Sequence, residues 1–278
     1  MHIGVKVGVF MLYTKQNQQY GTTRWNNLRN IAKQGGTYGA EDYSIIGVKK
    51  DYYVMTSSVA PLLSTQWDQW TPTGTACYAG CVTVSLAQIM RYYEKPVTVA
   101  WYAMPNTYSS TTLLNFFKAI GDNLGLDYTT CSVGANDTQI TKAFKAFDYN
   151  VTISNHSSYD VKTYLQKAKP APVSMGGFTS SSGGSGHQWV CDGFRIYEDV
   201  MYYFVEFLTD WGHGNYVYDQ WQMGSSTNPQ VDYLYPTTFH HMNWGYGGSG
   251  DGWFYDTYPN APTGNFQYKR TNAYATPK

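Results

Sequence analysis

The stretch that most constrains the fold of this chain is Gly80–Tyr93. Gly80 permits a tight turn, and a run of apolar residues at helical spacing follows it. These residues are Val82, Leu86, Ile89, Met90 and Tyr93. The spacing predicts a helix that begins at Cys81 and packs one apolar stripe against a core.

Cys81 falls in the first turn of this predicted helix. Unpaired backbone N–H groups and the helix dipole favour a negative charge there. The position therefore predicts a thiol that ionises more easily than a free one, and a thiolate is a nucleophile. A cysteine before an apolar helix can also be a small buried hydrophobe. The choice between these interpretations depends on residues elsewhere in the chain.

The composition is that of a globular chain with little charge. Its 278 residues suffice for one large domain or two small ones, and 42% of them are hydrophobic. Charged residues make up 14% and the formal net charge is zero, so nothing directs the chain to nucleic acid or to an anionic membrane. No apolar run approaches the roughly 20 residues that a membrane span requires. Met1–Leu12 lacks the apolar centre and small-residue cleavage site of a signal peptide.

Four cysteines, Cys77, Cys81, Cys131 and Cys191, are too few for a dense disulfide framework. If Cys81 stays free, at most one bridge can form among the other three, and the pattern does not choose the pair. Cys77 lies in the loop before the predicted helix, without the helix N-terminus that lowers a thiol pKa. Cys81 is therefore the better candidate nucleophile.

The order of elements predicts an α+β fold, with helices in the first half of the main domain and strands in the second. We expect residues 1–60 to be an N-terminal extension or the remnant of a pro-segment, and residues 61–278 to be the main domain. Predicted helices are Trp25–Lys33, Thr111–Asn123, Asp137–Phe147 and Tyr159–Ala168, with Asp137 and Ser158 as N-caps of the last two. Predicted strands are Pro172–Met175, His187–Tyr197, Met201–Leu208, Thr238–Trp244, Gly252–Asp256 and Gln267–Ala275.

Two downstream segments could complete a cysteine active site. A cysteine nucleophile needs a base to take its proton and a group that orients the base. His187 follows the glycine-rich segment 183–186 and begins an apolar strand, which would place its imidazole at the rim of a sheet. Asn243 and Trp244 end a later strand before another glycine turn. An asparagine carbonyl can fix an imidazole, and an indole can screen that bond from water.

These residues carry a resemblance to a known family. Motifs in the same order are Gly80-Cys81-Val82-Thr83, Ala87-Gln88-Ile89-Met90-Arg91-Tyr92, Gly186-His187 with Val190 and Asp192-Gly193, and Asn243-Trp244-Gly245-Tyr246-Gly247-Gly248 with Asp251-Gly252. From about Pro61 to the C-terminus the chain resembles the streptopain family of bacterial papain-like cysteine peptidases. The resemblance implies a papain-like fold in which the helical half, carrying the nucleophile helix, packs against a C-terminal antiparallel sheet.

The resemblance also implies roles for individual residues. Cys81 would be the nucleophile and His187 the general acid and base, forming a thiolate–imidazolium pair. Asn243 would orient His187, and Trp244 would cover the pair. Gln69 matches the family's oxyanion-hole glutamine and would act together with the Cys81 backbone N–H.

For the substrate groove, the resemblance implies Gly186 and the loop residues Ser132, Val133 and Gly134. Cys131 and Val133 depart from the family's loop, and the segment from about 198 to 236 is an insertion relative to streptopain. The resemblance further implies secretion or a bacterial cell-surface location, synthesis as a zymogen, and a protein or peptide substrate. An inhibitory pro-segment or inhibitor protein is a further expected partner. It implies no cofactor and no metal.

Three functions remain open from the sequence. The first is a cysteine endopeptidase that works through an acyl-enzyme. The second is a papain-like amidase or transpeptidase that acts on cell-wall peptides. The third is a non-catalytic binding module on the same scaffold. The joint presence of Gln69, Cys81, His187 and Asn243 argues against the third, because a lost activity usually leaves a gap in such a set.

Overall fold

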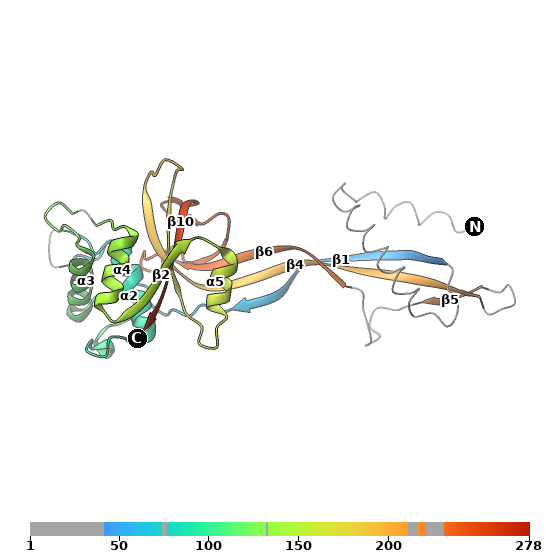
Figure 1. The fold of residues 1–278 in the computed structure, drawn as a ribbon, viewed down its shortest axis with the longest axis horizontal. Coiled ribbons are helices and arrows are strands. Elements are labelled where there is room, and N and C mark those ends of the chain that lie inside the picture. The colour runs from blue at the N-terminus through green and yellow to red at the C-terminus, as the bar shows by residue number, and fades with distance from the viewer. Residues whose placement is uncertain (1–41, 74–76, 132, 211–215, 221–230) are drawn as a thin grey trace. The chain divides into compact units, whose positions relative to one another are not determined.

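The computed structural model describes residues 42–73, 77–131, 133–210, 216–220 and 231–278 (Figure 1). Contacts divide the chain into two compact units: the chain up to Val54 together with Glu198–Pro236, and Met55–Tyr197 together with Thr237–Lys278. Most of the predicted extension thus shares one unit with the predicted insertion. The second unit carries all the predicted site residues. The predicted helix Trp25–Lys33 lies outside the described residues.

Helix α2, Cys81–Tyr93, confirms the predicted nucleophile helix. It begins after Gly80, whose φ of 81° suits glycine, and it ends at Glu94 in the left-handed conformation. Every residue from Val82 to Met90 is buried, so the helix runs through the core instead of lying on the surface. Two of its buried polar side chains are hydrogen-bonded inside: Ser85 Oγ lies 2.7 Å from Ser174 Oγ, and Gln88 bonds Thr65 and Asn243.

The other predicted helices of the described chain are also present. They are α3, Thr111–Leu124, α4, Asp137–Ala146, and α5, Ser158–Leu165, and a short 3₁₀ helix spans Trp101–Ala103. The predicted N-caps of α4 and α5 were each wrong by one residue. The side chain of Asn136 caps α4 in a reciprocal pair with Gln139, and Ser157 caps α5. In both cases the preceding residue also has a capping side chain and takes the extended conformation that an N-cap needs.

Most described strands form one sheet in which β2, β10, β3, β4, β6 and β7 are neighbours in turn, and β1 and β5 also pair with β4. Strands β8 and β9 pair with each other in a separate sheet. Each pair whose register is defined is antiparallel. The bounds are β1 Asp42–Val59, β2 Tyr149–Asn155, β3 Val173–Phe178, β4 Gly186–Asp210, β5 Tyr216–Gln220, β6 Val231–Asn243, β7 Gly252–Tyr255, β8 Asn260–Ala261, β9 Gly264–Asn265 and β10 Tyr268–Pro277. The two strands predicted between His187 and Leu208 are therefore one, β4, and strands β1, β2, β5, β8 and β9 were not predicted.

Both faces of the second unit's sheet are covered. On one face, α2, α3 and α4 share a core with Val190 and with Ala273 and Ala275 of β10. On the other, α5 packs with Trp189 and Cys191 of β4. Adjacent residues of β4 thus point into different cores, as strand geometry requires. The first residues of β4 and the end of β6 come together near the start of α2, where the site lies.

Candidate active site

Cys81 is the first residue of α2, a free thiol whose side chain is partly exposed. Burial raises the pKa of this thiol, while the backbone N–H groups of Gln188, Val82 and Cys81 itself act to lower it. The net pKa is raised, so the expected easy ionisation was wrong. The reason is that desolvation of the thiolate outweighs the amides at the helix start. The contact with Gln188 places the sulfur beside the residue that follows His187.

His187 is the second residue of β4 and is buried. Its Nε2 lies 2.9 Å from the backbone carbonyl oxygen of Trp244. Burial lowers the pKa of His187 to about 4, and the carbonyl of Trp244 offsets part of that shift. At neutral pH the ring is therefore neutral. Since Nε2 can only donate to a carbonyl, Nδ1 carries the lone pair that can accept a proton.

Asn243 bonds elsewhere than predicted. Its Oδ1 accepts from Gln88 Nε2 at 3.0 Å and from the Gly245 N–H at 3.2 Å. Its Nδ2 donates to the Thr65 carbonyl at 2.7 Å. Both ends of the amide are thereby used to tie the end of β6 to α2 and to the segment before Gln69. The contact that orients His187 comes from the next residue, through the main chain of Trp244.

Aromatic rings surround the imidazole of His187. The ring of Tyr246 stacks on it at 5.0 Å between centroids and 5° between planes. Trp244, predicted to cover the pair, has its ring centroid 6.2 Å from His187. The ring centroids of Trp189 and Phe266 lie 6.0 and 5.0 Å from that of His187. These rings exclude water from the imidazole, which explains the direction of its pKa shift.

Tyr246 is the site residue that the sequence interpretation left without a role. Its hydroxyl lies 2.6 Å from Thr263 Oγ1 and also bonds the side chain of Gln69. Burial raises its pKa, and the nearby charge of Cys81 raises it further. Tyr246 therefore neighbours His187, Gln69 and Cys81 at once. Its place two residues after Trp244 was the only signal available in the sequence.

Gln69 lies between the residue before the nucleophile and the turn after β6, whose Trp244 carbonyl bonds His187. Its backbone N–H donates to the Gly245 carbonyl at 2.8 Å, and its carbonyl accepts from the Gly80 N–H at 3.0 Å. Gly245 follows Trp244, and Gly80 precedes Cys81. Because Gln69 is buried and its side chain reaches Tyr246, its amide lies within the same group of residues as Cys81.

The oxyanion-hole role that the family resemblance implies for Gln69 predicts that Gln69→Ala lowers kcat by about 10²–10³-fold, since one such donor is typically worth roughly 3–4 kcal/mol in the transition state. Steady-state kinetics on a fluorogenic peptide would measure this. Gln66→Ala is the matched control, because Gln66 is exposed on the same segment. Equal kinetics for Gln69→Ala and Gln66→Ala would contradict an oxyanion role.

The predicted groove residues differ in what surrounds them. Val133 packs directly on Gly80, where an added Cβ would stand 2.8 Å from the Val133 Cβ. Gly134 is exposed and an added Cβ would meet nothing within 4 Å, so the space beside it is open. Gly186 pairs with Phe178, whose Cε1 would lie 3.0 Å from an added Cβ. Ser132 lies outside the described residues.

Within the described residues, no group of three or more His, Cys, Asp or Glu side chains is placed to hold a metal ion. In the same part of the chain, no helix is both long enough and apolar enough to cross a membrane.

No family model matches the chain, and no curated protein matches it by sequence. Among solved structures it is similar to active wild-type interpain A, a cysteine protease of Prevotella intermedia. The TM-score is 0.54 at 17% sequence identity, and the match covers 79% of this chain and 95% of interpain A. The fold is that of a cysteine protease. The mixed helices and antiparallel sheet predicted from the sequence agree with this likeness.

Proposed function

We propose that this protein is a cysteine endopeptidase with Cys81 as nucleophile and His187 as general acid and base. The observation that carries the proposal is the position of the Cys81 thiol, at the start of α2 and against the backbone N–H of Gln188. That position brings a nucleophile to the residue next to a buried, neutral imidazole. The fold likeness to a cysteine protease supports the same chemistry.

In the proposed reaction the proton of the Cys81 thiol passes to His187 Nδ1 as the sulfur attacks the substrate carbonyl. The pKa directions favour the neutral thiol and neutral imidazole at rest, so the ion pair forms during attack. The Cys81 backbone N–H and the Gln69 side-chain amide would bind the oxyanion. His187 then protonates the leaving amine, and water releases the acyl-enzyme with His187 as base.

The finer assignment is also a proposal: a papain-like enzyme of the streptopain family, secreted or held at a bacterial cell surface. The Cys77–Cys131 disulfide supports an oxidising compartment, because such bonds seldom persist in the cytosol. We further propose that the extension to residue 60 and the insertion 198–236 form one accessory module, since contacts group most of both in one unit. An inhibitory pro-segment or inhibitor protein is a further proposed partner, and the family resemblance is its support.

A peptidyl epoxide inhibitor tests the function directly. It should add one mass equivalent to the protein, mapped to Cys81 by peptide mass spectrometry, and should abolish casein cleavage. Cys191 serves as the internal control because it is a free but fully buried thiol. Casein left intact while cell-wall muropeptides are cut would replace the endopeptidase proposal with an amidase. Absence of labelling and of both cleavages would overturn the enzyme proposal.

The pH dependence of alkylation is a separate expected result. Because burial raises the pKa of the Cys81 thiol, and the pKa of His187 is about 4, neither group is charged near neutrality. The thiolate fraction then increases about tenfold per pH unit below the thiol pKa. The alkylation rate of Cys81 by iodoacetamide should follow this increase between about pH 6 and 8. A rate that is constant over this range would instead indicate a stable thiolate–imidazolium pair.

A further inference from the structure

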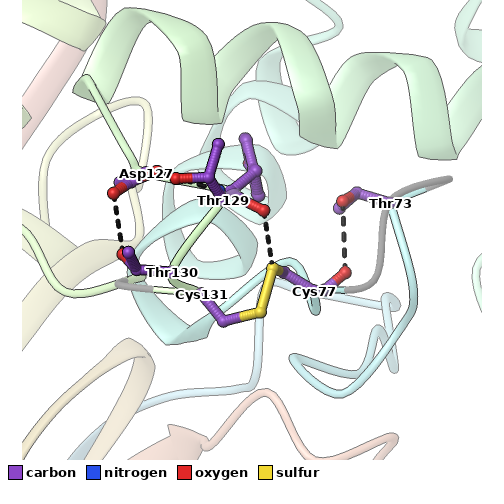
Figure 2. The surroundings of a disulfide bond; sticks show 7 residues. Thr73, Cys77, Asp127, Thr129, Thr130 and Cys131 are labelled. Atoms are coloured by element: carbon purple, nitrogen blue, oxygen red, sulfur yellow. Dashed lines mark hydrogen bonds between the residues drawn. A yellow bond between two sulfur atoms is a disulfide. The ribbon is translucent and has the colours of Figure 1, made fainter.

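A disulfide joins the loop before the nucleophile helix to the loop predicted to line the substrate groove. Cys77 and Cys131, 54 residues apart in sequence, are bonded to each other (Figure 2). Cys81 and Cys191 are free. Cys77 lies shortly before Gly80 and Cys81, and Cys131 lies two residues before Val133. One covalent bond therefore connects the two segments that meet beside the nucleophile.

The Cys77 side of the bond is firmly held. The carbonyl of Cys77 accepts from the N–H and from the Oγ1 of Thr73, both at 3.3 Å. Shortly afterwards Ala79 N–H donates to the Thr71 carbonyl at 2.9 Å. Because Gly80 is in turn bonded to Gln69, this loop is continuous with the proposed oxyanion-hole segment. Cys77 is thus a fixed anchor.

On the Cys131 side, the residues before the cysteine form a compact turn (Figure 2). The Asp127 carboxylate accepts from the N–H and hydroxyl of Thr129 and from the hydroxyl of Thr130. The carbonyl oxygen of Tyr128 lies 2.9 Å from Cys77 Sγ. The Tyr128 hydroxyl oxygen would stand 1.7 Å from a Cβ added at Gly121, so the Tyr128 ring packs directly on α3.

Residues 133–135, the described residues that follow Cys131, are held by few other contacts. Among the described residues, 133–135 make no hydrogen bond, and regular bonding resumes at Asn136, the cap of α4. This short segment is placed by van der Waals contacts, of Val133 with Gly80 and of Ala135 with the core, and by the covalent bond at Cys131. Val133 therefore lies against the residue that precedes the nucleophile, while Gly134 faces open space.

We propose that the Cys77–Cys131 disulfide is a positioning element for substrate binding: it holds Val133 and Gly134 against the start of α2 as one wall of the groove. This inference rests on the proposed peptidase function. Opening the bond leaves the wall held by van der Waals contact alone, so binding must then order it at a cost in affinity. The chemistry at Cys81 does not depend on that wall, so the loss falls on KM and leaves kcat nearly unchanged.

The bond is open to chemical reduction from one side. Cys131 is exposed whereas Cys77 is buried. A thiolate of a small dithiol attacks the Cys131 sulfur and releases Cys77, and the second thiol of the reductant then closes its own ring and releases Cys131. Two electrons pass from the dithiol to the bond, and each cysteine gains one proton. Full activity therefore requires a reduced Cys81 and an oxidised Cys77–Cys131 pair. At low substrate concentration, the cleavage rate should first rise with reductant concentration, as Cys81 is reduced, and then fall, as the disulfide opens.

The test compares the double variant Cys77→Ser/Cys131→Ser with the wild type and with Cys191→Ala, which removes a thiol that is buried away from the groove. We expect a roughly tenfold higher KM for a peptide substrate in the double variant, with kcat within about twofold. Titration of the wild type with dithiothreitol should raise its KM to the same value, while the KM of the double variant should not change with dithiothreitol. The rate of Cys81 alkylation by iodoacetamide, which needs no groove, should be equal in all three proteins.

An unchanged KM in the double variant and in the reduced wild type would overturn the positioning role while leaving the peptidase proposal in place. A wild-type protein that cleaves no peptide at any reductant concentration would instead contradict the proposed function. If the double variant does not fold, the KM of the reduced wild-type protein is the measurement that decides whether the disulfide positions the groove wall. Differential alkylation would verify that the bond is open, and circular dichroism that the protein is folded.

Discussion

Replacement of Cys81 with alanine is expected to reduce kcat/KM for a peptide substrate by at least about 10⁴-fold, and His187→Ala by a similar factor. In the proposed mechanism the two residues act on the same proton, so the double variant should be scarcely slower than either single one. Without the thiol no acyl-enzyme forms, and without the imidazole nothing takes the proton from a thiol whose pKa is raised by burial. Initial rates on a fluorogenic peptide, with intact-mass detection of the acyl-enzyme, would measure these losses.

Cys191→Ala is the control for the Cys81 variant, because Cys191 is a free cysteine packed in the core on the α5 face. It should keep wild-type turnover per folded molecule. Single variants whose losses multiply in the double variant would show that Cys81 and His187 do not act as a unit. Substantial turnover in Cys81→Ala would show that a residue other than Cys81 is the nucleophile.

The second large effect is on stability. Asn243→Ala should lower the free energy of unfolding by about 3 kcal/mol, because three buried partners lose a hydrogen bond at about 1 kcal/mol or more each. These partners are the Gln88 amide, the Gly245 N–H and the Thr65 carbonyl. Turnover per folded molecule should stay within about threefold, since the Trp244 carbonyl continues to hold His187. Urea denaturation and active-site titration would separate the two quantities.

An exposed asparagine provides the comparison for this variant. Asn150 lies on β2 with its side chain exposed, so Asn150→Ala should change stability by no more than about 0.5 kcal/mol. A hundredfold loss of kcat in Asn243→Ala with unchanged stability would mean that Asn243 orients the imidazole after all. The stability result expected here follows only from the hydrogen bonds that the structure assigns to Asn243.

Local patterns predicted the helices well. Apolar spacing located α2, but it predicted one buried stripe, whereas the structure buries every residue from Val82 to Met90. The caps Asn136 and Ser157 were missed by one residue, since each stands beside another capping residue and only the backbone decides between them. Strand β2 was missed because its pattern is short and half exposed, and its partner β10 lies more than a hundred residues away.

The sequence by itself determined which chemical groups are available and that Cys81 begins a helix. It also indicated that His187 and Trp244 stand at strand ends. Tertiary structure alone decided which atoms meet: the Trp244 carbonyl on His187, the Asn243 amide on Gln88, and Tyr246 over the imidazole. It also decided that Cys77 bonds Cys131, and that burial raises the thiol pKa. The physical reason is that hydrogen bonds and desolvation depend on neighbours distant in the chain, whereas helix periodicity depends on residues three or four positions apart.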